Sequence, residues 1–282
     1  MTVNPTGRLR PINVGNVVSV GISLYRTNFK TYSGLALKAL LWYLVPVYGW
    51  ARSLMILGQI GRLGFKEMVR EPETVKQALR QVLPRLWAFL GIALLVALIQ
   101  FGINIALSIV RGVVSIPLLF LSGAGETGAA IAGLGQLLLI LIFLAIQIWF
   151  QARFWLYDLL LAVETDLEAT QAISRSWKLT QGSSFRVQLV FLIAYLIMLP
   201  LIILSFIPFL FTVPYFATFS PDNPDPTFFI VILLATLAFL LLLFVVSIVT
   251  VPFWQSVKTA LYYDCRSRKE GLDLELRDRK TS

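Results

Sequence analysis

The chain has 282 residues, of which 57 % are hydrophobic and only 14 % are charged, and its formal net charge is +9. A soluble domain carries about 25 % charged residues, so this composition excludes a chain whose whole surface faces water. Histidine is absent and Cys265 is the only cysteine, which excludes an intrachain disulfide and a cysteine-based metal cluster.

Six apolar segments follow one another along the chain, near residues 31–46, 48–65, 87–112, 131–156, 186–212 and 227–253. A helix needs about 20 residues to cross about 30 Å of hydrocarbon, and we interpret the six segments as membrane helices. The first two are short and are interrupted by Lys38, Arg52 and Arg62. One long tilted helix, or a shallow re-entrant hairpin around residues 46–49, is therefore the alternative for this part of the chain.

The basic residues decide the predicted orientation. Of the 24 Lys and Arg residues, 21 lie in four clusters, within residues 8–30, 62–85, 153–186 and 258–280. Short loops rich in Lys and Arg stay in the cytoplasm, and hairpins between the clusters keep all four on that side. The sequence predicts an all-α, polytopic integral membrane protein with about six transmembrane helices in three hairpins and both termini in the cytoplasm.

Amphipathic segments precede the hairpins. Residues 72–86 place an apolar stripe on one helical face (Val75, Ala78, Leu79, Val82, Leu83, Leu86), with Lys76, Arg80 and Arg85 off that stripe. A short helix of this kind is expected to lie in the headgroup plane. Residues 13–28 and 167–179 repeat the design less clearly. We expect a tail and interfacial helix in 1–30, a transmembrane domain in 31–256 and a charged cytoplasmic tail in 257–282.

An internal threefold repeat accounts for the order of these segments. Each repeat consists of an interfacial helix, a membrane hairpin and a basic segment where the chain returns to the cytoplasmic side. Two pairs of short matches favour it. Ala51-Arg52 corresponds to Ala152-Arg153, and residues 77–79 (QAL) correspond to residues 171–173 (QAI).

Three stretches carry a resemblance to a known family. They are residues 10–15 (RPINVG) with 24–29 (LYRTNF), residues 174–182 (SRSWKLTQG), and residues 261–264 (LYYD) with 268–276 (RKEGLDLEL). The chain resembles the membrane-domain family of glycerophosphoryl diester phosphodiesterase. The resemblance implies a prokaryotic membrane domain of six helices, located in the cytoplasmic (inner) membrane. The phosphodiesterase chemistry of that family belongs to a separate soluble domain that uses histidines, so no catalytic residue is carried over.

The candidate functional residues form two sets. Anionic lipid headgroups are the expected partners of the basic interfacial residues, which are Lys76, Arg80, Arg85, Arg175 and Lys178. Polar residues recur on one face of the third and fourth apolar segments, namely Gln100, Asn104, Ser108 and Arg111, and then Gln136, Gln147, Gln151 and Asp158. Polar groups avoid hydrocarbon, so we expect both faces to point into the helix bundle, either as interhelical hydrogen bonds or as a polar path.

Nothing in the sequence indicates catalysis. Residues 123–128 spell GxGxxG, but a dinucleotide site needs a preceding strand and a following acidic residue, and a turn entering a helix is the interpretation here. We expect no enzyme, no cofactor, no metal site and no nucleic-acid partner. The leading hypothesis is a membrane-embedded scaffold or binding domain for anionic lipid and partner proteins. The alternative is a transporter or export factor for a lipid or small solute.

Overall fold

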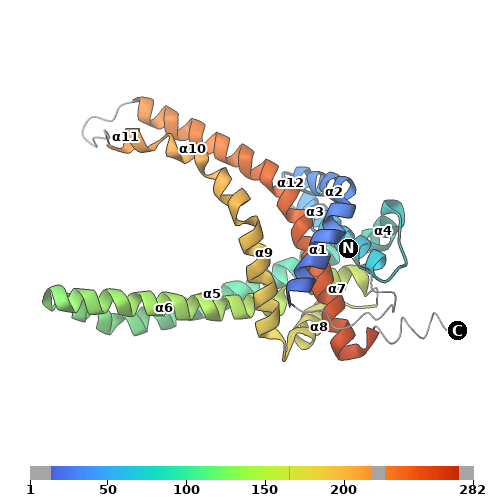
Figure 1. Cartoon of the computed structure of the whole chain (residues 1–282), viewed down its shortest axis with the longest axis horizontal. Helices are drawn as coiled ribbons and strands as arrows, with labels where there is room; N and C mark the ends of the chain where they lie inside the picture. Colours follow the sequence, from blue (N-terminus) through green and yellow to red (C-terminus); the bar gives the residue numbers. More distant parts are fainter. Residues whose placement is uncertain (1–13, 165, 218–225, 273–282) are drawn as a thin grey trace.

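A computed structural model describes residues 14–164, 166–217 and 226–272, and all regular structure in those residues is helical. The prediction of an all-α protein is therefore confirmed. The helices form a head from which two arms diverge (Figure 1). One arm is the antiparallel pair α5 (Leu86–Ser122) and α6 (Gly125–Phe154). The other pairs α9 (Ser184–Ser205) with the first part of α12 (Pro226–Glu270), and the short helices α10 (Ile207–Leu210) and α11 (Val213–Ala217) lie at its far end.

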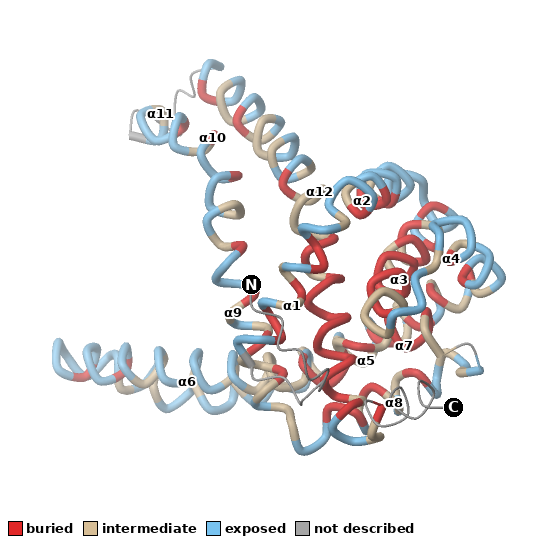
Figure 2. The backbone as a smooth tube through the Cα atoms, turned by 45° about the vertical axis from the view of Figure 1, so that its right-hand side comes forward, coloured by how far each residue is buried: buried red, intermediate tan, exposed pale blue. Residues whose placement is uncertain are grey.

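The head collects the remaining helices and the second part of α12. These helices are α1 (Val14–Thr27), α2 (Phe29–Tyr43), α3 (Tyr48–Met68), α4 (Val75–Val82), the 3-10 helix η1 (Leu83–Arg85), α7 (Tyr157–Val163) and α8 (Ala169–Thr180). Buried residues are concentrated in the head, whereas the arms are mostly exposed (Figure 2).

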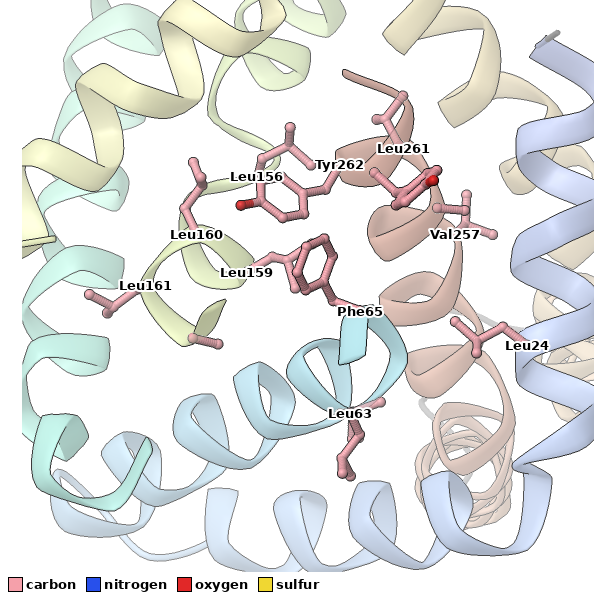
Figure 3. Packing of buried hydrophobic residues seen from close by; sticks show 14 of the residues in the cluster. Leu24, Leu63, Phe65, Leu156, Leu159, Leu160, Leu161, Val257, Leu261 and Tyr262 are labelled. Atoms are coloured by element: carbon pink, nitrogen blue, oxygen red, sulfur yellow. The ribbon is translucent and has the colours of Figure 1, made fainter. Parts of the chain in front are cut away.

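Helix α3 lies at the centre of the head because glycines on its surface let other helices approach closely. A Cβ atom on Gly58 would lie 2.5 Å from the ring of Phe89, and one on Gly61 would lie 2.7 Å from the side chain of Leu159. Further along α3, the ring of Phe65 packs 5.1 Å from the ring of Tyr262 in α12. Figure 3 shows side chains of α3, α7 and α12 meeting in this core.

Four helical segments of the described residues are long and apolar enough to cross a membrane. They are Val75–Ser122, Gly125–Val163, Ser184–Ser205 and Pro226–Glu270. Only 6 to 22 % of the most apolar stretch of each segment is buried within the protein, so most of its apolar residues are exposed on the surface. Lipid is the solvent in which such surface is stable. The predicted total of six crossings stays a prediction.

Two helix boundaries differ from the sequence prediction, each for a local reason. The expected helix over 72–86 is divided into α4 and η1, because Pro84 cannot donate to the helical ladder and starts the 3-10 turn. The expected charged tail begins inside α12, which continues to Glu270. Val257, Ala260 and Leu261 of this part are fully buried in the head, and their packing holds the segment helical. Residues 1–13 and 273–282 of the predicted tails lie outside the described part.

The two helices that the repeat hypothesis matches begin in the same way. Thr74 caps α4 and exchanges hydrogen bonds with Gln77, while Glu168 caps α8 and exchanges them with Gln171. In both capping boxes the glutamine occupies the third helical position, where it satisfies a backbone amide that the helix leaves unpaired. The QAL and QAI matches therefore correspond to the same kind of capped N-terminus in α4 and in α8.

Candidate functional site

The basic residues of the head divide into those that hold the fold together and those that face outwards. Arg85 belongs to the first group. Its guanidinium donates to the backbone oxygens of Leu161 at 2.6 Å and of Glu164 at 3.0 Å, and also to that of Leu167. These oxygens lie at and just beyond the C-terminal end of α7, where the helix leaves carbonyls unpaired and a cation is favourable. Arg85 is thus occupied within the head.

Arg175 also belongs to the first group. It pairs with Glu164 at 3.3 Å and with Glu270 at 2.6 Å, and the Tyr262 hydroxyl donates to the other carboxylate oxygen of Glu164 at 2.8 Å. These contacts join α8 to the end of α7 and to α12. The guanidinium is directed at two carboxylates of its own chain.

Lys76, Arg80 and Lys178 have exposed side chains. In the part of the chain that the structure describes, their side chains make no ion pair. Lys76 and Arg80 lie on α4, whose apolar residues Ala78 and Val82 are buried against the head. The packing of α4 on the head therefore turns these two cations outwards. We call Lys76, Arg80 and Lys178 the exposed basic set.

A buried ion pair joins α7 to α12. Lys258 Nζ lies 2.9 Å from Oδ1 and 2.8 Å from Oδ2 of Asp158, and Gln255 Nε2 donates to Oδ2 at 3.1 Å. Asp158 and Lys258 are each 8 % exposed. The sequence prediction placed Asp158 on an intramembrane polar face, whereas its partners are in the head. The repeated spacing of Gln59 with Arg62 and of Gln255 with Lys258 is the sequence signal that could have indicated a buried charge in α12.

Arg62 occupies the corresponding buried position in α3. Its guanidinium binds both carboxylate oxygens of Glu73, at 2.9 and 2.8 Å, and donates to the backbone oxygen of Ala162 at 3.0 Å. A bidentate pair of this kind fixes orientation as well as distance. Arg62 therefore holds the loop before α4 and the end of α7 against α3.

Two further contacts fix helices to one another at the base of the arms. The guanidinium of Arg153 lies 4.8 Å from the ring centroid of Trp149 and 5.0 Å from that of Trp177, which joins α6 to α8. The Tyr25 hydroxyl of α1 donates to the backbone oxygen of Val249 in α12 at 3.0 Å, and burial raises the pKa of this hydroxyl above its ordinary value.

The predicted polar faces of the arms are not brought into a closed bundle. On α5, Asn104 donates to the backbone oxygen of Gln100 at 2.8 Å, Ser108 is exposed and Arg111 is half-buried. On α6, Gln136 and Gln147 are half-buried and Gln151 is exposed. The two faces thus lie on a helix pair that remains largely open to its surroundings.

A cavity of about 410 Å³ lies between α6 and α9. It is lined by Leu144, Gln147, Ile148, Gln151, Ala152 and Phe191. Two of the predicted polar residues, Gln147 and Gln151, therefore share one cavity. Gln100 and Asn104, which a polar path between the two predicted faces requires, are not among its lining residues.

The described residues hold no group of three or more Cys, Asp or Glu side chains that could bind a metal ion. The carboxylates of the head are instead engaged with arginines and lysines of the chain, as Glu73, Asp158 and Glu164 show.

Comparison with known protein families shows a match over the second half of the chain. The model of the family described as the membrane domain of glycerophosphoryl diester phosphodiesterase matches residues 132–281, which is more than half of the chain. The stretches 174–182 and 261–276 fall within this match, and the stretch 10–29 lies outside it. Neither a curated protein nor a solved structure matches the chain.

Proposed function

Because the chain belongs to the membrane-domain family of glycerophosphoryl diester phosphodiesterase, we propose that it is a non-enzymatic, membrane-embedded scaffold or binding domain for anionic lipid and partner proteins. The match covers the membrane domain alone, and the chain contains no histidine. The proposal therefore takes no phosphodiesterase activity from the family name.

The exposed basic set carries this proposal. Lys76 and Arg80 lie on α4, shortly before α5 begins, and Lys178 lies near the end of α8, shortly before α9 begins, so each residue precedes a helix of one of the apolar arms. A Lys or Arg near an anionic membrane surface contributes about 1 kcal/mol of attraction. Because Arg85 and Arg175 are engaged within the head, we assign headgroup binding to the exposed basic set alone.

The proposed location is the cytoplasmic membrane of a prokaryote, with the head and both termini on the cytoplasmic side. An even number of crossings satisfies this arrangement. Six crossings result if α2 and α3 span the bilayer, and four result if they enter it from one side. Both versions keep the exposed basic set beside the inner leaflet, which carries the negative surface potential.

Lipid retention tests the proposed binding role. The purified chain is titrated with phosphatidylglycerol in a neutral detergent, and bound lipid is counted by native mass spectrometry. Lys76→Glu, Arg80→Glu and Lys178→Glu are each expected to weaken binding at least fivefold, since a loss of about 1 kcal/mol corresponds to that factor. Arg111→Glu, on α5 away from the head, is the matched control for the change in charge. Equal retention by all four variants would refute the proposal.

A transporter or export factor for a lipid or small solute is the second candidate, and the cavity beside Gln147 and Gln151 is the observation that favours it. Filling this cavity with Gln147→Phe and Gln151→Leu should abolish transport of a solute that uses it. The same variants should leave phosphatidylglycerol retention by the head unchanged, which separates the two candidate functions.

A further inference from the structure

The turn between α2 and α3 carries a dense group of exposed aromatic and aliphatic side chains. We call residues 41–50 the aromatic tip. Its exposed large side chains are Leu41, Trp42, Tyr43, Leu44, Val45, Val47, Tyr48 and Trp50, and Leu44 reaches 73 % exposure. Trp and Tyr are the residues enriched where a membrane meets water, because one part of each ring system is apolar and another is polar.

The hairpin is too short to bring this tip across a bilayer from the head. Helix α2 has 15 residues, which at 1.5 Å per residue gives about 22 Å. The hydrocarbon core is about 30 Å thick. The inner part of α3 is not available to lengthen the hairpin in lipid, because Arg62 and Gln59 of α3 are buried in the polar contacts of the head.

A contact with α5 sets the depth of the tip. The ring of Tyr48 packs 6.4 Å from the ring of Trp87, which is itself 58 % exposed. Trp87 follows Arg85 and the basic helix α4 directly, so it marks the end of α5 that belongs to the head. If the first hairpin crossed the bilayer, its tip would lie about a membrane thickness away from Trp87. The observed contact instead places the tip beside the end of α5 that packs in the head.

The distribution of tryptophan supports the same level. The seven tryptophans are Trp42, Trp50, Trp87, Trp149, Trp155, Trp177 and Trp254. Each lies at the aromatic tip, in the head or where an arm joins the head. Residues 88–148 and 178–253, which contain the outer parts of both arms, have none. The aromatic tip thus continues a belt that marks one membrane interface.

Charge and backbone geometry agree with an interfacial position. Lys38 lies one turn before Trp42 and is exposed, and Arg52 follows Trp50, so cations flank the tip where phosphate groups would be. At the apex, Val47 has φ +60° and ψ −75°, an unfavourable conformation for a β-branched residue. This strained residue presents its own side chain and those of its neighbours at the surface.

We propose that the aromatic tip docks into the boundary between headgroups and acyl chains of the cytoplasmic leaflet, so that α2 and α3 form an interfacial anchor that does not cross the membrane. The partner is the lipid surface itself. The anchor would set the height and tilt of the head relative to the bilayer. It stands independently of the proposed lipid-retention role, because it concerns a different surface and uses none of the exposed basic set.

Fluorescence quenching in vesicles tests the anchor on the full chain. In a Cys265→Ala background, Val45→Cys is labelled with an environment-sensitive fluorophore, and the protein is reconstituted with lipids that carry a quencher on the headgroup or at the end of an acyl chain. The headgroup quencher is expected to reduce the Val45→Cys signal more than the deep quencher. Thr170→Cys, on the exposed start of α8, is the control in the head and should respond less to both.

Labelling of intact cells with a membrane-impermeant maleimide gives the second readout. Gly123→Cys, in the turn between α5 and α6, should react from outside, and Val45→Cys should not. Reaction of Val45→Cys from outside, or stronger quenching by the deep lipid, would overturn the anchor in favour of a crossing or deeply inserted hairpin. Insensitivity of Val45→Cys to both quenchers would equally overturn it, since the tip would then face water or protein.

Discussion

The buried pair of Asp158 and Lys258 gives the sharpest test of how the head is held together. Each residue is 8 % exposed, and the ammonium lies within 2.9 Å of both carboxylate oxygens. Removing one partner leaves the other charge buried without compensation, which costs about 3–5 kcal/mol. Replacing both partners by apolar residues of similar volume removes that penalty. Asp158→Leu and Lys258→Met should each destabilise the protein strongly, and the double variant should be more stable than either single variant.

The stability of these variants is measured by tryptophan fluorescence during unfolding in a mild detergent. Trp155, just before α7, and Trp254 of α12 pack 5.9 Å apart, so separation of the two helices changes their emission. Free energies of unfolding for the parent, the two single variants and the double variant complete a double-mutant cycle. Additive effects in the cycle, or single variants as stable as the parent, would refute the interpretation of this pair as a buried structural contact.

Three further variants test the packing of the head and the base of an arm. Gly21→Ala should be about 1–3 kcal/mol less stable than the matched helix variant Gly34→Ala. A Cβ atom at Gly21 would lie 2.8 Å from the backbone of Val257, whereas nothing lies within 4 Å of one at Gly34. Equal melting temperatures of the two variants would contradict this close approach of α1 to α12. Thr74→Ala should cost about 1 kcal/mol of stability through loss of the α4 cap, and hydrogen exchange in the first turn of α4 should become faster. Exchange as slow as in the parent protein would show that the cap is unimportant. Arg153→Lys should cost about 1 kcal/mol because an ammonium cannot stack against two indole rings as a guanidinium does, and unfolding in detergent with unchanged stability would argue against that role.

The membrane helices were predictable because their signal is local. Long apolar runs and the basic clusters beside them predicted the helical class and the approximate positions of the two long arms. The matches at Gln77 and Gln171 were also local, and they mark two equivalent helix starts. Helix ends differ from the pattern where a single residue or distant packing decides them, as at Pro84 and in the buried end of α12.

The roles of individual charges could not be derived from the sequence. Arg80 and Arg85 look alike in the pattern of residues 72–86, yet Arg80 is exposed and Arg85 donates to carbonyls at the end of α7. The partners of Arg85 lie more than 70 positions away along the chain, and no spacing rule reaches that far. The same holds for the contact of Tyr48 with Trp87, which gives the first hairpin its proposed depth.

Paired topology reporters test the central claim, which is that the head and its basic residues lie against the inner leaflet. Fusions after residues 76, 123 and 170 are made to green fluorescent protein, which is fluorescent in the cytoplasm, and to alkaline phosphatase, which is active outside it. Fluorescence at 76 and 170 with phosphatase activity at 123 is the expected result. Phosphatase activity at 76 or 170 would place the exposed basic set on the wrong face, and the proposed binding role would be rejected with it.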